Sequence, residues 1–327
     1  MSSDGENTKR TVAGALEEIG DEQMQKQLKA DIALLTVVII WGSTFVLIKD
    51  AIQHIQTYNF LSLRFGIAAI FLALFSYKKL PGLDRVTLRN GVILGLMLFG
   101  GYAFQTVGLN YTTASNAAFI VGFSAVIVPV ISAMYLKKWP QPAAVLGVLL
   151  AMSGLGLLTL GDSFALNIGD VYSFMCTFFF ALQIIFIDRY TRLSDPMLLA
   201  TVEVGTVAAA SVLFTFILEQ PIIPYRPNVW LALLVTSLLA TTYAFLVQNV
   251  AQKYTSPTHT ALIFIGEPVF ALAFAFILLG ELLTFRQFTG CALILAGMIA
   301  AEFKSMGTRK RSGIATHSAG IKKTGAN

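Results

Sequence analysis

Residues 57–77 read TYNFLSLRFGIAAIFLALFSY, an almost wholly uncharged run in which Arg64 is the one charged side chain. A helix needs about 20 mostly apolar residues to cross roughly 30 Å of hydrocarbon, so this run predicts a membrane-spanning helix. Nine similar runs predict an all-α membrane protein with ten transmembrane helices: Ile32 to Lys49, Asn90 to Leu109, Ser115 to Leu136, Ala143 to Gly161, Gly169 to Asp188, Pro196 to Leu218, Asn228 to Gln252, Pro257 to Leu279 and Phe285 to Phe303.

The composition excludes a soluble domain, because 56% of the residues are hydrophobic and 13% are charged, whereas soluble domains carry about 25% charged residues. The net charge of +5 is spread in short clusters between apolar runs and forms no single patch, so we expect no nucleic-acid partner. The histidines and the two cysteines do not cluster with metal-ligand spacing, and we expect no metal and no cofactor.

The distribution of Lys and Arg predicts the orientation in the plasma membrane. Short loops on the cytoplasmic side of membrane proteins carry an excess of these residues. With a cytoplasmic amino terminus the inside loops hold Lys78, Lys79, Arg85, Arg89, Lys137, Lys138, Arg189, Arg192 and Lys253, and the outside loops hold Arg226 and Arg286. We therefore expect both tails, polar residues 1–30 and basic residues 304–327, in the cytoplasm, with disorder favoured over a helix in residues 1–30.

The chain also repeats itself. In a first register of the chain against itself, Gln105 falls on Gln248, Tyr111 on Tyr254, Thr112 on Thr255, Gly147 on Gly290 and Gly154 on Gly297; in a second register, Asp31 falls on Asp170 and Gly66 on Gly205. The predicted units are residues 31–161 and 168–303, each with five helices. Because five is odd, the second copy enters the membrane from the opposite side, as in many secondary transporters.

Several short motifs follow one another in this order along the chain: Trp41-Gly42-Ser43-Thr44-Phe45 with Lys49, Arg64-Phe65, Glu267-Pro268 and Gly280-Glu281. Together they resemble the EamA group of the drug/metabolite transporter superfamily. The resemblance implies a carrier of metabolites or drugs, whose fifth and tenth helices serve dimerisation or scaffold packing. The first copy departs from the pattern, since its mid-span proline, Pro129, lies about one turn later than the position that matches Pro268.

Three ionisable residues fall inside apolar runs, where a charge is costly and marks a candidate site. Arg64 is predicted to attract a substrate carboxylate or phosphate, Glu203 to bind an amine or a proton, and Glu267 to form a protonatable site beside Pro268. Repeat symmetry places Arg64 and Glu203 at opposite ends of a shared cavity. The structural alternatives are an ion pair, a snorkelling side chain, or a neutral acid bonded to a neighbouring helix.

Uncharged candidates complete the predicted site. Gln105, Asn116, Gln248 and His259 can line the cavity, or can hold helices together through interhelical hydrogen bonds. Trp41 offers an amphipathic face to a solute, and Gly42 allows close backbone approach; simple packing is the alternative. Gly42, Pro129 and Pro268 are the expected gating or helix-break positions.

No phosphate-binding loop of the Walker type occurs, so the sequence favours a secondary carrier working by alternating access. A cavity with one Arg and two Glu suits an amino acid or related zwitterion, and export is the expected direction. Expected partners are this small-molecule substrate, membrane lipid, and protons acting through Glu203 or Glu267, in a monomer or homodimer. The alternatives are a multidrug or other metabolite permease of the same fold, a channel or a receptor; an enzyme is disfavoured.

Overall fold

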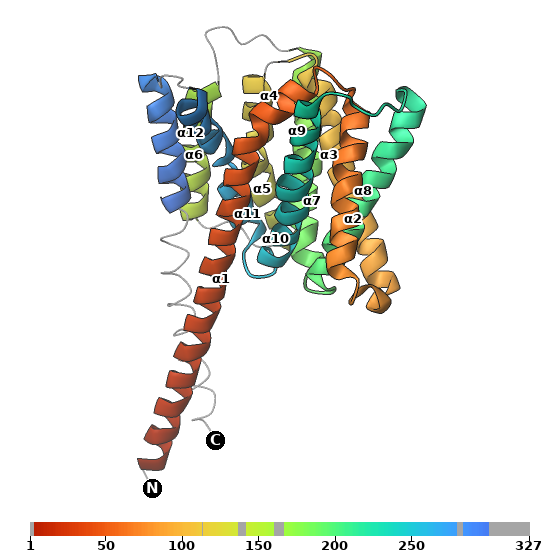
Figure 1. Cartoon of the computed structure of the whole chain (residues 1–327). Helices are drawn as coiled ribbons and strands as arrows, with labels where there is room; N and C mark the ends of the chain where they lie inside the picture. The colour runs from red at the N-terminus through yellow and green to blue at the C-terminus, as the bar shows by residue number, and fades with distance from the viewer. Residues whose placement is uncertain (1–2, 113, 137–141, 160–166, 280–283, 301–327) are drawn as a thin grey trace.

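The computed structural model describes residues 3–112, 114–136, 142–159, 167–279 and 284–300, which fold as helices without strands. Figure 1 shows them as one bundle with a long first helix. The elements are α1 (Ser3–Ala51), α2 (Thr57–Ser76), η1 (Leu80–Gly82), α3 (Arg85–Leu109), α4 (Ala114–Gly122), α5 (Ser124–Leu136), α6 (Pro142–Thr159), α7 (Ile168–Tyr190), α8 (Pro196–Leu218), α9 (Pro227–Ser237), η2 (Leu238–Tyr243), α10 (Ala244–Ala251), α11 (Pro257–Phe264), α12 (Glu267–Leu279) and the helix Phe285–Ala300.

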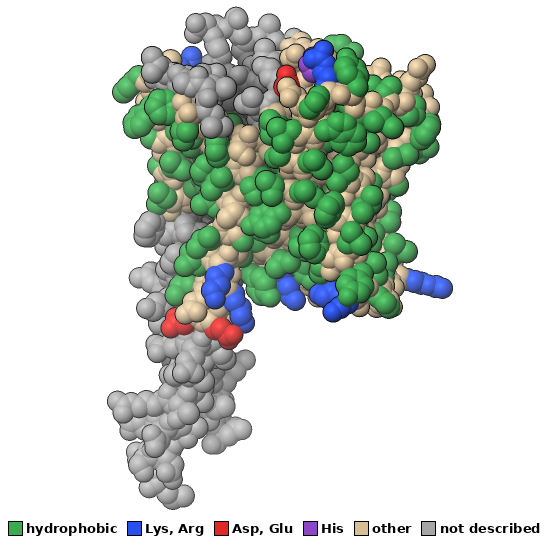
Figure 2. Space-filling model, in the orientation of Figure 1, with side chains coloured by type: hydrophobic (Ala, Val, Ile, Leu, Met, Phe, Trp, Pro, Cys, Tyr) green, Lys and Arg blue, Asp and Glu red, His purple; other side chains and the backbone are tan. Residues whose placement is uncertain are grey.

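Seven helical segments of the described residues are long and apolar enough to cross a membrane. Three shorter apolar helices accompany them: Phe119–Met134, Pro142–Leu158 and Phe285–Ala300. The space-filling view shows apolar side chains over the flanks of the bundle and charged side chains near its two ends (Figure 2). A multi-pass membrane protein is therefore the architecture of this chain, and each expected apolar run overlaps one of these helical segments.

The first helix departs from the sequence expectation of disorder in residues 1–30. α1 is helical from Ser3 and continues below the bundle (Figure 1). Its polar part is rich in good helix formers and includes a Glu22–Lys26 ion pair of 2.8 Å at i, i+4 spacing, which stabilises an exposed helix. The helix therefore does not stop where the apolar sequence stops.

Close contacts between helices occur at glycines. A Cβ added to Gly95 in α3 would lie 2.6 Å from the carbonyl oxygen of Glu203 in α8. One added to Gly154 in α6 would lie 2.5 Å from the carbonyl oxygen of Gly290, in the helix Phe285–Ala300. These positions need glycine because the facing backbones leave no room for a side chain. The fifth and tenth apolar segments thus pack on each other within one chain.

Two apolar segments contain a break in the helix. α4 ends at Gly122 and α5 begins at Ser124, and α11 ends at Phe264 while α12 begins at Glu267. The breaks centre on Phe123 and Gly266, which the first repeat register superposes. Pro268 lies in the first turn of α12, where a proline is tolerated, whereas Pro129 lies inside α5 and the helix continues through it.

Candidate functional site

Arg64 lies in the middle of α2 and is 3% exposed. Its Nε donates a hydrogen bond to the Thr241 hydroxyl at 2.8 Å, and Nη2 donates to the Ala240 carbonyl at 3.3 Å. The guanidinium also lies 5.1 Å from the ring centre of Tyr102 and 5.3 Å from that of Phe65, a favourable arrangement for a cation over aromatic faces. The side chain is therefore fixed by neutral groups.

The acceptors of Arg64 belong to η2, a π-helical turn within the α9–α10 segment. A π turn interrupts the regular hydrogen-bond ladder of a helix and recurs at functional sites. The Ala240 carbonyl in this turn also accepts a 2.9 Å hydrogen bond from Nε1 of Trp41 in α1. One backbone carbonyl thus connects the two side chains that sequence analysis selected from the first and second apolar segments.

Glu267 occupies the first position of α12, next to the break after α11, and is partly exposed. The Arg64 guanidinium acts on its carboxylate electrostatically, although no described carboxylate lies within ion-pair distance of Arg64. Gly42 of α1 packs directly on this helix start, since an added Cβ would lie 2.9 Å from the Glu267 carbonyl oxygen. The structure thus brings Trp41, Gly42, Arg64 and Glu267 together.

Aromatic rings surround these polar groups. The Trp41 ring packs edge-on against Phe264 with centroids 5.0 Å apart, and it lies 6.1 Å from Phe245. Tyr102 packs edge-on against Phe65 at 5.1 Å and against Phe180 at 5.4 Å. A cation, a carboxylate and several ring faces therefore converge from α1, α2, α3, α10 and the α11–α12 break, a combination that suits a small amphiphilic solute.

Glu203 lies in a different environment, with 0% exposure on α8. Its two carboxylate oxygens accept hydrogen bonds of 2.8 Å from Gln183 Nε2 and from Asn249 Nδ2. Gln248 Nε2 donates to the Gln183 side-chain oxygen at 3.2 Å and to that of Gln252 at 3.1 Å. Glu203 and Gln248 thus share a buried amide network that joins α7, α8 and α10.

The other predicted site residues are dispersed. Gln105 lies on α3 with a partly exposed side chain. His259 lies on α11, with Nδ1 3.3 Å from the Gln27 side-chain nitrogen on α1. The side chain of Asn116 lies outside the described residues. Pro129 lies within α5, away from the break at Phe123.

Sequence analysis missed Tyr102, Thr241 and Gln183. Gln183 carried a usable signal, as a polar residue inside an apolar run. Tyr102 is one of many aromatic residues in the chain and has no distinguishing pattern. The role of Thr241 depends on the π-helical turn, which the spacing of residues in the sequence does not predict.

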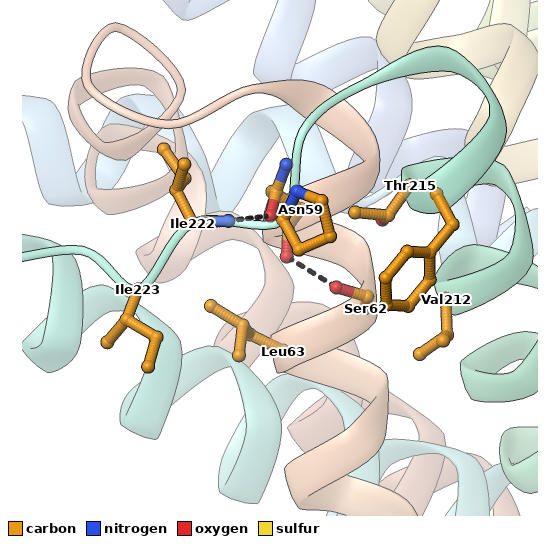
Figure 3. Close-up of a pocket in the computed structure, with 9 residues that line it drawn as sticks. Asn59, Ser62, Leu63, Val212, Thr215, Ile222 and Ile223 are labelled. Atoms are coloured by element: carbon orange, nitrogen blue, oxygen red, sulfur yellow. Dashed lines mark hydrogen bonds between the residues drawn. The ribbon is translucent and has the colours of Figure 1, made fainter.

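A separate groove lies at the end of the bundle where α2 begins and α8 ends (Figure 3). Its volume is about 320 Å³, and its lining includes Asn59, Ser62, Val212 and Phe216. The Asn59 side chain accepts a hydrogen bond of 2.9 Å from the Ile222 backbone, and the nearby Glu219 carboxylate accepts from the Tyr58 and Asn59 backbone N–H groups. These hydrogen bonds hold the α8–α9 connection against the start of α2. None of the site residues predicted from the sequence lines this groove.

Comparison with known proteins gives consistent results. The model of the EamA-like transporter family matches residues 28–160 and again residues 167–301. A protein described as an uncharacterized transporter of Archaeoglobus fulgidus is 37% identical over 285 residues, which cover 87% of this chain and 89% of that relative.

A probable amino-acid metabolite efflux pump of Salmonella typhimurium is 26% identical over 284 residues, covering 82% of this chain and 93% of the relative. A crystal structure with 19% sequence identity superposes with a TM-score of 0.73 and covers 84% of this chain and 98% of its own. That likeness establishes a shared fold.

Proposed function

The chain belongs to the EamA-like transporter family, and we propose that it is a secondary carrier that exports a small carboxylate-bearing metabolite across the plasma membrane by alternating access. The favoured substrate is an amino acid or related zwitterion. The observation that carries this proposal is the Arg64 guanidinium, buried at mid-helix and held by a hydroxyl, a carbonyl and ring faces. A buried cation without a fixed carboxylate partner is suited to a carboxylate that arrives with the solute.

The groups around Arg64 supply the rest of a zwitterion site. Glu267 offers a carboxylate to an amine, at a helix start that Gly42 keeps in close contact with α1. The Trp41 and Tyr102 rings offer apolar faces to a side chain. The arrangement matches the chemistry of an amino acid, in which a carboxylate, an ammonium and a variable side chain radiate from one carbon.

Alternating access needs two halves that exchange roles. The proposal therefore includes ten spans in two inverted repeats, which the helix contacts support, and both termini in the cytoplasm, which the distribution of Lys and Arg between loops supports. Under the repeat registers α2 and α8 are mates, and they pack on each other. The repeat equivalent of α3 is the α9–η2–α10 segment, and that of α7 is α1. Helix α3 packs on α7, and the α9–η2–α10 segment packs on α1 in the same way. These contacts are therefore related as a pseudo-two-fold axis in the membrane plane requires.

Export is favoured because one relative is described as a probable efflux pump. The test is counterflow of labelled amino acids in proteoliposomes that contain the purified chain. We expect saturable flux that Arg64→Ala and Glu267→Gln each reduce by at least about tenfold, which corresponds to the loss of one charge-assisted contact. Arg192→Ala is the matched control, because Arg192 is exposed, lies in the turn after α7 and pairs with Asp188 near the end of that helix.

The aromatic lining favours a second candidate, a permease for aromatic or cationic drugs of the same fold. Flux of such compounds, without flux of any amino acid, would reject the amino-acid assignment and support the drug permease. Amino-acid flux that survives both substitutions would remove Arg64 and Glu267 from the site.

A further inference from the structure

Asp31 is a buried carboxylate of α1, the helix that extends below the bundle (Figure 1). It is 9% exposed, and neither of its oxygens has a hydrogen bond of ordinary length from the described residues, although the Thr255 hydroxyl and the Gln27 amide lie near enough to stabilise its charge. The Thr255 hydroxyl, in the turn between α10 and α11, is buried beside it and points its weak hydrogen bond at Asp31, without a bond of ordinary length to any described residue. Such an arrangement is costly for an ionised carboxylate, because these weak contacts only partly replace the water that it has lost.

The repeat supplies an internal comparison. The mates of Asp31 and Thr255 are Asp170 and Thr112, at the opposite end of the bundle. There the Thr112 hydroxyl donates a 2.6 Å hydrogen bond to Asp170 Oδ1, and Asp170 Oδ2 accepts from the Asn167 backbone. The same pair of residues thus joins helix ends at both places, with a short hydrogen bond at Asp170 and none of ordinary length at Asp31.

The two ends also differ in a titratable group. His259 acts electrostatically on Asp31, while the mate of His259 in the first repeat register is Asn116. The imidazole is the side chain that changes charge between about pH 5 and 8. The same stretch of α1 carries Asp21, Glu22, Lys26 and Lys29, and the turn carries Lys253 and Tyr254; Glu22 pairs with Lys26.

We propose that Asp31 and His259 form a proton-binding site that controls the packing of α1 against α10 and α11 at the inner end of the carrier. With a proton bound to the pair, the acid is tolerated in its present buried position and the helix ends stay packed through Ala30, Leu34 and Ala251. When the proton leaves, the carboxylate needs water, and the helix ends separate to admit it. The opposite end, with Asp170 fully hydrogen-bonded and Asn116 in place of the histidine, lacks this response.

The site has a role in transport only if the proposed carrier function holds, but its existence can be tested without any substrate. The measurement is amide hydrogen exchange of the full-length chain in lipid nanodiscs at about pH 6 and about pH 8, corrected for the intrinsic dependence of exchange on pH. We expect the peptides that cover residues 27–36 and 251–264 to lose about tenfold in protection at the higher pH.

Asp31→Asn should remain protected at both pH values, because the amide is neutral. His259→Asn should change the pH at which protection is lost, and it remains informative if Asp31→Asn fails to fold. The control Asp170→Asn should retain the wild-type response at the inner end. The proposal is overturned by a wild-type chain with no pH response in these peptides, by an unchanged response in Asp31→Asn, or by a His259→Asn response that coincides with the wild type.

Discussion

Replacing Glu203 by alanine should destabilise the fold, whereas replacing Glu267 should affect transport. Glu203→Ala removes the acceptor of two 2.8 Å hydrogen bonds and leaves the Gln183 and Asn249 amides without that partner inside the bundle. Hydrogen bonds to charged groups contribute roughly 1.5–3 kcal/mol each, and interhelical bonds in membranes average nearer to about 0.6 kcal/mol. Two such bonds predict a loss of about 1–6 kcal/mol in the free energy of unfolding.

The assay is unfolding in mixed micelles titrated with SDS, followed by circular dichroism, with counterflow measured on the same preparations. Glu267→Ala is the matched comparison, because its carboxylate has no hydrogen bond to any described residue, and we expect its stability to change by less than about 0.5 kcal/mol. A Glu203→Ala chain of unchanged stability that no longer transports would refute the structural role and place Glu203 in the solute site.

Three further predictions concern stability. Gly154→Ala should lower the free energy of unfolding by about 1–3 kcal/mol, because the new Cβ meets the Gly290 carbonyl. Gly66→Ala is the control: no atom lies within 4 Å of a Cβ added there, so this variant should be as stable as the wild type or more stable in the same SDS titration. Equal effects of the two substitutions would contradict the close helix contact at Gly154. Glu219→Ala should lower the thermal midpoint by removing the cap of α2, worth about 1–2 kcal/mol, and an unchanged midpoint would argue against that cap. The hydroxyl and backbone N–H of Thr87 hold the pKa of Asp84 below its usual value. The stabilising contribution of Asp84 is therefore present above its unfolded-state pKa and is lost as the pH falls through its folded-state pKa. Asp84→Asn should flatten this loss of stability at acid pH in thermal melts, and a pH profile identical to that of the wild type would refute the prediction.

The helical architecture was predictable because crossing a membrane imposes a length and a composition on each segment. The polar part of α1 was not, since its helix depends on propensity and local ion pairs rather than on an apolar run. The helix breaks illustrate the same limit. Pro129 indicated a break by residue type, yet the break lies at Phe123, where no side chain marks it.

The candidate site was predictable in part. Arg64, Trp41 and Glu267 stood out because polar or charged groups are expensive in hydrocarbon, and the structure brings them together. The same argument selected Glu203, but cost alone cannot distinguish a carboxylate that contacts the solute from one that accepts hydrogen bonds from buried amides. The partner Gln183 decides the environment of Glu203, and only the three-dimensional arrangement brings that amide to the carboxylate.

The π turn at η2 makes the two halves of this chain unequal. Its mate in the first repeat register is the segment 95–100, which is regular α-helix within α3. A carbonyl that serves both Trp41 and Arg64 therefore exists in one copy alone. Under the proposed alternating access, the solute meets walls of different construction in the inward-open and outward-open states, which are then distinct chemical environments with their own dissociation constants. Saturation curves recorded from the two sides of the membrane should then have different half-saturation concentrations. This asymmetry would follow from the backbone conformation of η2.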